Sequence, residues 1–130
     1  MKAENVRLSE DGKSVVIIDQ TKLPNEEIFL TLNSADEFYN AIYLLQVRGA
    51  PAIGIFAGYA LYVLAGQINT DSEEDFFVQL AAHKRKLNSS RPTAVNLSHA
   101  LERVENAAKK EAGKGFYAIL GAMLHESAAI

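Results

Sequence analysis

The stretch that decides how this chain folds lies between two predicted helices and reads Val47-Arg48-Gly49-Ala50-Pro51-Ala52-Ile53-Gly54. Pro51 suits the first turn of a helix, where its missing N–H costs nothing, and Gly49 allows the tight turn before it. The second helix therefore begins here, with its unpaired amides and the positive end of its dipole close to Arg48. This arrangement is typical of anion sites at helix starts, but a plain helix–loop–helix corner with a solvated arginine also fits the segment.

Upstream of this stretch, the sequence predicts a small antiparallel sheet. Residues 5–9, 14–19 and 27–32 read as three short strands, with turn sequences at residues 10–13 and 22–25 between them. Three strands need a helical partner to be stable. We therefore expect the sheet to pack against the helices that follow it.

The first predicted helix covers residues 35–46. Ser34 and Glu37 have the spacing of a capping box, which marks the start of this helix. Apolar residues recur at i, i+4 and i+7 and predict a buried stripe of Phe38, Ile42 and Leu45.

The second predicted helix covers residues 51–65 and carries no charge, so we expect it to be buried on most sides. Gly54 and Gly58 lie four residues apart and present a flat face that another backbone can approach closely. A membrane span is the alternative interpretation. The segment is shorter than the roughly 20 residues that a bilayer needs, which favours a core helix.

Downstream, residues 72–87 predict a helix with acidic residues near its start and basic residues near its end. Residues 88–97 then repeat the opening pattern of a polar turn, an arginine (Arg91), a proline and a helix start, with Thr93 as the expected cap. A last amphipathic helix follows Gly115. The predicted fold is α+β and mainly helical, with a three-stranded antiparallel sheet followed by four to five helices in a single domain over residues 1–130.

Composition excludes several classes of protein. The chain has 13 basic and 16 acidic side chains, a net charge of -3, which argues against nucleic-acid binding through a basic surface. It has no cysteine, and its first residues lack the apolar core of a secretory signal, so we expect a cytoplasmic protein without a membrane anchor. The three histidines lack metal-ligand spacing, and no nucleophile–base pair is recognisable. We therefore predict no metal, no cofactor and no catalytic residue within this chain.

Two segments together carry a family resemblance. VRGAPAIG at residues 47–54 and SRPTAVNL at residues 90–97 resemble the two N-terminal signatures of the methylthioribose-1-phosphate isomerase family, whose superfamily includes regulatory subunits of the translation initiation exchange factor. The resemblance implies a sheet-and-helix N-terminal domain followed by a Rossmann-like catalytic domain. This chain resembles the first domain alone, so we expect an excised domain or a truncated gene product.

The resemblance also implies a function. The family converts 5-methylthioribose 1-phosphate to 5-methylthioribulose 1-phosphate in methionine salvage, without a metal, using a cysteine and an aspartate of the C-terminal domain that have no counterpart here. What carries over is phosphate binding by Arg48, Gly49, Ala50 and Arg91. We expect a phosphorylated pentose as ligand, inactivity in isolation, and a separate catalytic domain or self-association as partner. The alternative is a free-standing regulatory or protein-interaction module related to the initiation factor subunits.

Overall fold

The structure is a computed structural model, and it describes residues 5–130. Its sheet consists of three short strands, β1 (Val6–Leu8), β2 (Val15–Ile18) and β3 (Phe29–Leu32). After the sheet come α1 (Ala35–Tyr43), α2 (Ala50–Gln67), α3 (Glu73–Ser89), α4 (Val95–Lys110) and α5 (Phe116–Ala128). The predicted mainly helical α+β fold is thus confirmed over the described residues.

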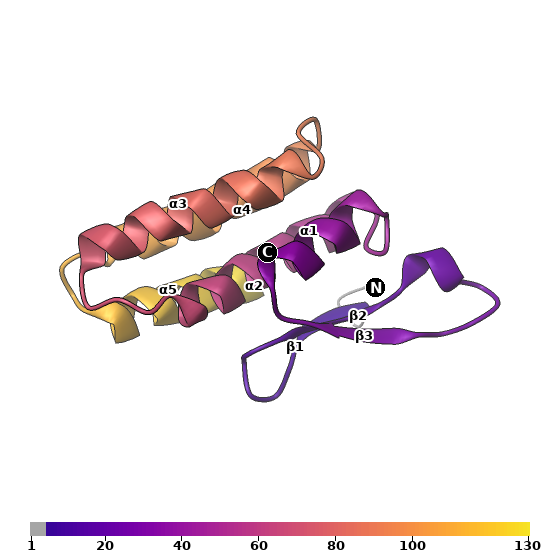
Figure 1. Cartoon of the computed structure of the whole chain (residues 1–130), viewed down its shortest axis with the longest axis horizontal. Helices are drawn as coiled ribbons and strands as arrows, with labels where there is room; N and C mark the ends of the chain where they lie inside the picture. The colour runs from indigo at the N-terminus through magenta and orange to yellow at the C-terminus, as the bar shows by residue number, and fades with distance from the viewer. Residues whose placement is uncertain (1–4) are drawn as a thin grey trace.

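The sheet is antiparallel, with strand order β1-β2-β3. Val15 of β2 pairs with Leu8 on one side and Leu32 on the other. Val15 and Ile17 are buried, because alternate residues of a strand point to the same face and this face packs on α2. Figure 1 shows the sheet at the lower right of the molecule, below α1, with α3 and α4 at the top.

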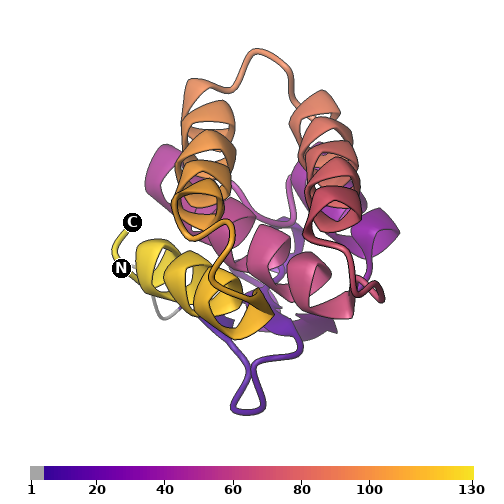
Figure 2. The same cartoon turned by 90° about the vertical axis from the view of Figure 1, so that its left-hand side faces the viewer.

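Helix α2 is the centre of the molecule. It contacts α4, α5, α3, α1 and the sheet, and Figure 2 shows it between the sheet and the α3–α4 pair. Of the described helices, only α2 is long and apolar enough to cross a membrane, but 56% of that window is buried inside the fold. Phe56, Ala57 and Leu61 are fully covered, as expected for a core helix without charges.

Two of the three glycines of α2, Gly54 and Gly58, lie in close contact with its neighbours. A Cβ at Gly58 would lie 2.9 Å from Ile130 Cδ1, and a Cβ at Gly54 would lie 3.8 Å from the Asn96 carbonyl oxygen of α4. The flat face predicted from their spacing is therefore occupied by α4 and by the end of the chain. A side chain at Gly58 would therefore require the Ile130 side chain to shift.

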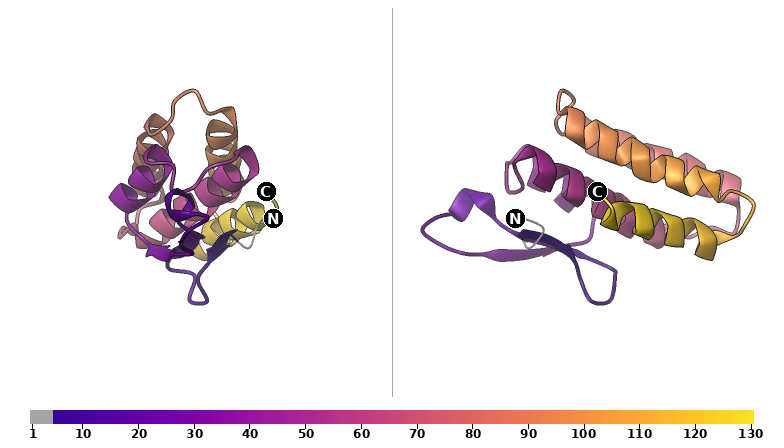
Figure 3. Two further views of the ribbon diagram at one scale, coloured as in Figure 1. Left: turned by 90° about the vertical axis from the view of Figure 1, so that its right-hand side faces the viewer. Right: turned by 180° about the vertical axis from the view of Figure 1, so that it is seen from behind.

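The α3–α4 pair lies above α2 and is joined to α5 by a polar contact. Glu73, in the first turn of α3, accepts hydrogen bonds from the amides of Gly113 and Gly115, at 2.7 and 3.1 Å. Figure 3 shows this α4–α5 turn at one end of the helices and the α3–α4 turn at the other. The carboxylate thus fixes the direction in which the chain enters α5.

Two sequence predictions about helix ends were wrong. Helix α1 ends at Tyr43, and Leu45 has a φ of 63° and is 40% exposed, so Val47 takes the buried position expected of Leu45. Helix α4 begins after Ala94, and Thr93 is exposed and does not cap it. Helix α1 thus ends earlier than predicted, because the chain turns at the left-handed Leu45, whereas the turn before α4 extends one residue beyond the predicted cap.

Candidate functional site

The first candidate element is the corner between α1 and α2, residues 44–49. Its backbone folds back on α1, because the amides of Gln46 and Val47 both donate to the carbonyl oxygen of Ala41, at 2.9 and 3.2 Å. Val47 is 2% exposed and anchors the corner in the core. Arg48, which follows it directly, is therefore presented at the surface from a fixed backbone.

The same corner is also attached to the sheet. The amide of Gln20, just after β2, donates to the carbonyl oxygen of Gln46 at 2.9 Å. The side chain of Gln46 donates from Nε2 to Oδ2 of Asp19 at 3.2 Å. Arg48 lines a small hollow of about 60 Å³ beside this contact, together with Gln20 and Ile18.

The start of α2 is open to a ligand. Gly49 is the N-cap residue, with a φ of 94°, and no side chain caps the helix. Pro51 has no N–H, so the amides of Ala50 and Ala52 are the uncapped donors of the first turn. Together with the helix dipole, these donors favour an anion next to Arg48.

The second candidate element is the corner between α3 and α4, residues 90–94. Ser90 is 5% exposed, and its Oγ donates to the carbonyl oxygen of Leu87 at 2.6 Å. The amide of Ala94 donates to the carbonyl oxygen of Arg91 at 2.9 Å, which closes a tight turn around Pro92. Arg91 is half-buried, and α4 begins without a side-chain cap.

Both arginines lack an acidic partner. Within residues 5–130, every ion pair is made by other basic side chains, so neither guanidinium is neutralised by a carboxylate. Figures 1 and 3 show the two corners at the same end of the helices. No contact joins Arg48 to Arg91 in the described structure, so any common ligand must bridge the space between the corners.

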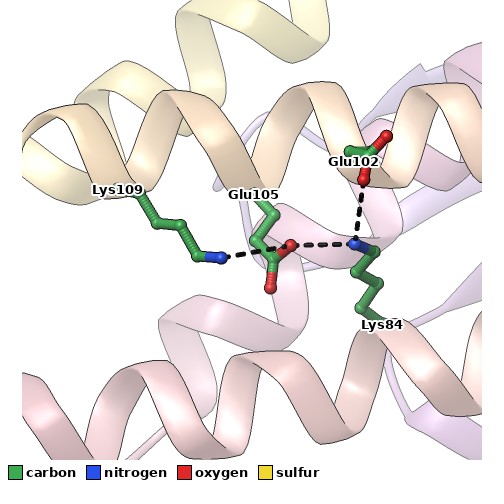
Figure 4. Close-up of polar contacts among 4 residues, drawn as sticks. All are labelled: Lys84, Glu102, Glu105 and Lys109. Atoms are coloured by element: carbon green, nitrogen blue, oxygen red, sulfur yellow. Dashed lines mark hydrogen bonds and ion pairs between the residues drawn. The ribbon is translucent and has the colours of Figure 1, made fainter.

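A cluster of charged side chains, shown in Figure 4, fixes α3 against α4. Glu105 of α4 is 5% exposed, and its Oε1 accepts a hydrogen bond from Lys84 of α3 at 2.9 Å. Lys84 also lies 3.8 Å from Glu102, and Lys109 lies 3.7 Å from Glu105. Because a buried carboxylate needs such partners, this cluster sets how the two helices, and hence the Arg91 corner, are arranged.

Next to the start of α2 lies an open cavity of about 490 Å³. Ala50 is the single predicted site residue that lines it, whereas Arg48, Gly49 and Arg91 do not. Five polar residues of α4 that we had not predicted also line it: Asn96, His99, Glu102, Arg103 and Asn106. Their spacing of three and four places them on one helix face, a periodicity that could have revealed them.

Two titratable groups, His83 within α3 and Asp19 after β2, have shifted pKa values. Partial burial and the charge of Lys86 lower the pKa of His83, on α3. Burial raises the pKa of Asp19, but hydrogen bonds from Thr21 and Gln46 and the charge of Lys22 outweigh it, so the pKa lies below its ordinary value. Asp19 is therefore ionised at neutral pH. Among residues 5–130 there is no cluster of three or more histidine and acidic side chains that could hold a metal ion.

The sequence is similar to a known protein family and to several named proteins. Residues 46–128 match the sequence model of the Initiation factor 2 subunit family. The chain is 49% identical over 100 residues to a methylthioribose-1-phosphate isomerase of Parabacteroides distasonis, covering 77% of this chain and 30% of that protein. It is 43% identical over 122 residues to a 5-deoxyribose 1-phosphate isomerase of Petrotoga mobilis, covering 94% and 35%.

Solved structures agree with these matches. A 5-methylthioribose 1-phosphate isomerase of Pyrococcus horikoshii superposes with a TM-score of 0.89 and 31% identity over 96% of this chain and 35% of that one. The delta subunit of the initiation factor eIF-2B from A. fulgidus gives a TM-score of 0.86 and 30% identity over the same shares. The chain thus spans about a third of the length of the relatives it matches and corresponds to their N-terminal region.

Proposed function

Because the chain belongs to the Initiation factor 2 subunit family, we propose that it is the N-terminal substrate-binding domain of a sugar-phosphate isomerase. The relatives at 49% and 43% identity carry the names of isomerases of methylthioribose 1-phosphate and of 5-deoxyribose 1-phosphate. The substrate class is therefore a pentose 1-phosphate, and its charged end is the part that this domain binds.

The observation that carries this proposal is the pair of arginines without acidic partners, each at the start of a helix at the same end of the molecule. Arginine binds phosphate through two parallel N–H···O bonds, with more geometric specificity than lysine. Arg48 and Arg91 act as the two arms of a clamp, and the amides of Gly49 and Ala50 add donors at the open start of α2.

In this proposal the domain holds the phosphate and does not transfer protons. The chain has no cysteine, and the described corners present arginines and backbone amides without a carboxylate or histidine as a partner for either guanidinium. An aldose-to-ketose isomerisation moves hydrogen between adjacent carbons and needs positioned acid–base groups, each worth typically ~10² to 10⁴ in rate. These groups come from the remaining two thirds of the longer relatives.

The experiment is a pair of measurements on the purified chain. Titration calorimetry with 5-methylthioribose 1-phosphate is expected to show binding, and an assay for the ketose product is expected to show no turnover. Ribose without a phosphate is the control and is expected not to bind. Turnover in a clean preparation would contradict the assignment of catalysis elsewhere, and absence of any phosphate-dependent binding would contradict the clamp.

A second candidate is a regulatory module that binds another protein. It is supported by the TM-score of 0.86 with the eIF-2B delta subunit. The higher sequence identity to the isomerases favours the first candidate. Tight, phosphosugar-independent binding of an initiation factor subunit, together with no affinity for the phosphosugar, would favour the second.

A further inference from the structure

Asp19 is a buried carboxylate that links two distant parts of the chain. Its side chain is 3% exposed, although it lies in the segment that leaves the sheet after β2. Oδ1 accepts hydrogen bonds from the amide and the hydroxyl of Thr21, at 2.9 and 2.6 Å. Oδ2 accepts a hydrogen bond from Nε2 of Gln46, which is 27 residues away, at 3.2 Å.

Burying a carboxylate at this position costs free energy because its charge is removed from water. Within residues 5–130 no ion pair includes Asp19, so its charge is stabilised mainly by hydrogen bonds, with a smaller contribution from the charge of Lys22. Capping the short turn at Thr21 would need only one acceptor, which an exposed serine or asparagine could supply. The second oxygen is used for Gln46, so a local cap does not by itself account for the carboxylate.

Gln46 connects this carboxylate to the arginine. Its carbonyl oxygen accepts from the amide of Gln20 at 2.9 Å, so both its side chain and its backbone are attached to the segment after β2. Val47 follows and is buried, and Arg48 then lines the same small hollow as Gln20. The direction of the Arg48 side chain and of the Gly49 amide therefore depends on where Gln46 is held.

We propose that Asp19 is a positioning residue of the phosphate site, acting through Gln46 to hold the α1–α2 corner so that Arg48 and the Gly49 amide face the same anion. This inference rests on the function proposed above for Arg48. Asp19 does not touch the ligand. It sets the geometry of groups that do, and errors in such geometry typically weaken binding or activity by ~10- to 100-fold.

The test compares four variants by titration with 5-methylthioribose 1-phosphate and by amide hydrogen exchange. Asp19→Ala and Gln46→Ala are expected to weaken binding about tenfold and to speed exchange of the Val47 amide. Asp19→Asn is expected to restore most of the affinity, because the Gln46 amide can rotate and accept from the new side chain. Thr21→Val is the matched control: it removes one hydrogen bond to Asp19, lowers stability, and leaves the affinity unchanged.

Arg48→Ala separates the two proposals. If this variant binds like the wild-type chain, the clamp itself is wrong, whatever Asp19 does. If Arg48→Ala loses affinity but Gln46→Ala binds like the wild type, the clamp stands and the role of Asp19 is overturned. Gln46→Ala keeps both bonds from Thr21 to Asp19, so it remains informative even if Asp19→Ala does not fold.

Discussion

The two arginine corners present the same side chain at the start of a helix, but they are held in different ways. The corner at residues 44–49 needs two left-handed residues, Leu45 and Gly49, and is attached to the sheet through Gln46. The corner at residues 90–94 has no positive φ and is closed by short-range bonds within three residues. Its position depends on the packing of α3 against α4.

An arginine at the start of a helix can therefore be positioned either by long-range contacts or by a local turn. Each kind of positioning is sensitive to different substitutions. The first corner should respond to substitutions that alter backbone conformation or the contact with the sheet. The second should respond to substitutions that alter the α3–α4 interface.

The largest effect is expected at the α3–α4 interface. Lys84→Met leaves Glu105 buried with Lys109, at 3.7 Å, as its remaining basic neighbour. Removing one partner of a buried ion pair is strongly destabilising, and we expect the free energy of unfolding to fall by about 3 kcal/mol. Urea denaturation measures this change, and amide exchange should accelerate near Arg91 but not near Arg48.

Two controls make this prediction specific. Lys86→Met removes an exposed pair with Asp36 and is expected to cost less than about 1 kcal/mol. The double variant Lys84→Met with Glu105→Leu removes both charges and should recover most of the lost stability. Equal destabilisation by Lys84→Met and Lys86→Met would show that the buried cluster does not determine this interface.

The next effect concerns the backbone of the first corner. Gly49→Ala places a side chain at a φ of 94°, where there is space but the conformation is strained. We expect a loss of about 1 to 2 kcal/mol in unfolding free energy. Gly66→Ala is the matched control, because Gly66 also has space for a Cβ but lies in the last turns of α2. This substitution should leave the free energy of unfolding unchanged or raise it. A neutral Gly49→Ala would mean that the corner relaxes easily.

A gain of stability is expected at the second corner. Ala94 is the N-cap of α4, has an extended conformation with φ -82° and ψ 102°, and offers no side-chain cap. Ala94→Ser should therefore stabilise the chain by roughly 1 kcal/mol, as measured by thermal denaturation. Gly49→Ser, the equivalent change at the other corner, should destabilise. Similar results for the two substitutions would remove the distinction between the corners.

The smallest effect is a pH dependence on α3. Because the pKa of His83 is lowered in the folded chain by burial and by Lys86, the unfolded chain takes up the proton first as the pH falls. Stability should therefore decrease as the pH drops below the ordinary histidine pKa of about 6.5. Urea denaturation at neutral and mildly acidic pH measures this, and His83→Gln should reduce the difference. An unchanged pH dependence in His83→Gln would assign it to other groups.

Sequence alone predicted the elements whose signals are local. The capping box at Ser34 and Glu37 is present, with both reciprocal hydrogen bonds. The helix start before Pro51 lies within one residue of its predicted position. The predicted approach of another backbone is found at Gly54, next to the Asn96 carbonyl oxygen, whereas Gly58 is contacted by side chains. In each case the determining residues are at most four positions apart.

Features that depend on distant residues were not predictable in this way. The bond between Asp19 and Gln46 spans 27 residues, and neither residue carries a signal of its own. The exposure of Leu45 follows from the early end of α1 and the left-handed turn, which the apolar periodicity does not encode. The roles of Arg48, Gly49, Ala50 and Arg91 in phosphate binding remain a prediction.

The most direct test of the central claim is a double-mutant cycle on that site. Calorimetry would compare the binding of 5-methylthioribose 1-phosphate by the wild-type chain, Arg48→Ala, Arg91→Ala and the double variant. If both arginines hold one phosphate, each single substitution should weaken binding at least about tenfold, and their effects should not be additive. Wild-type affinity in either single variant would contradict the two-armed clamp.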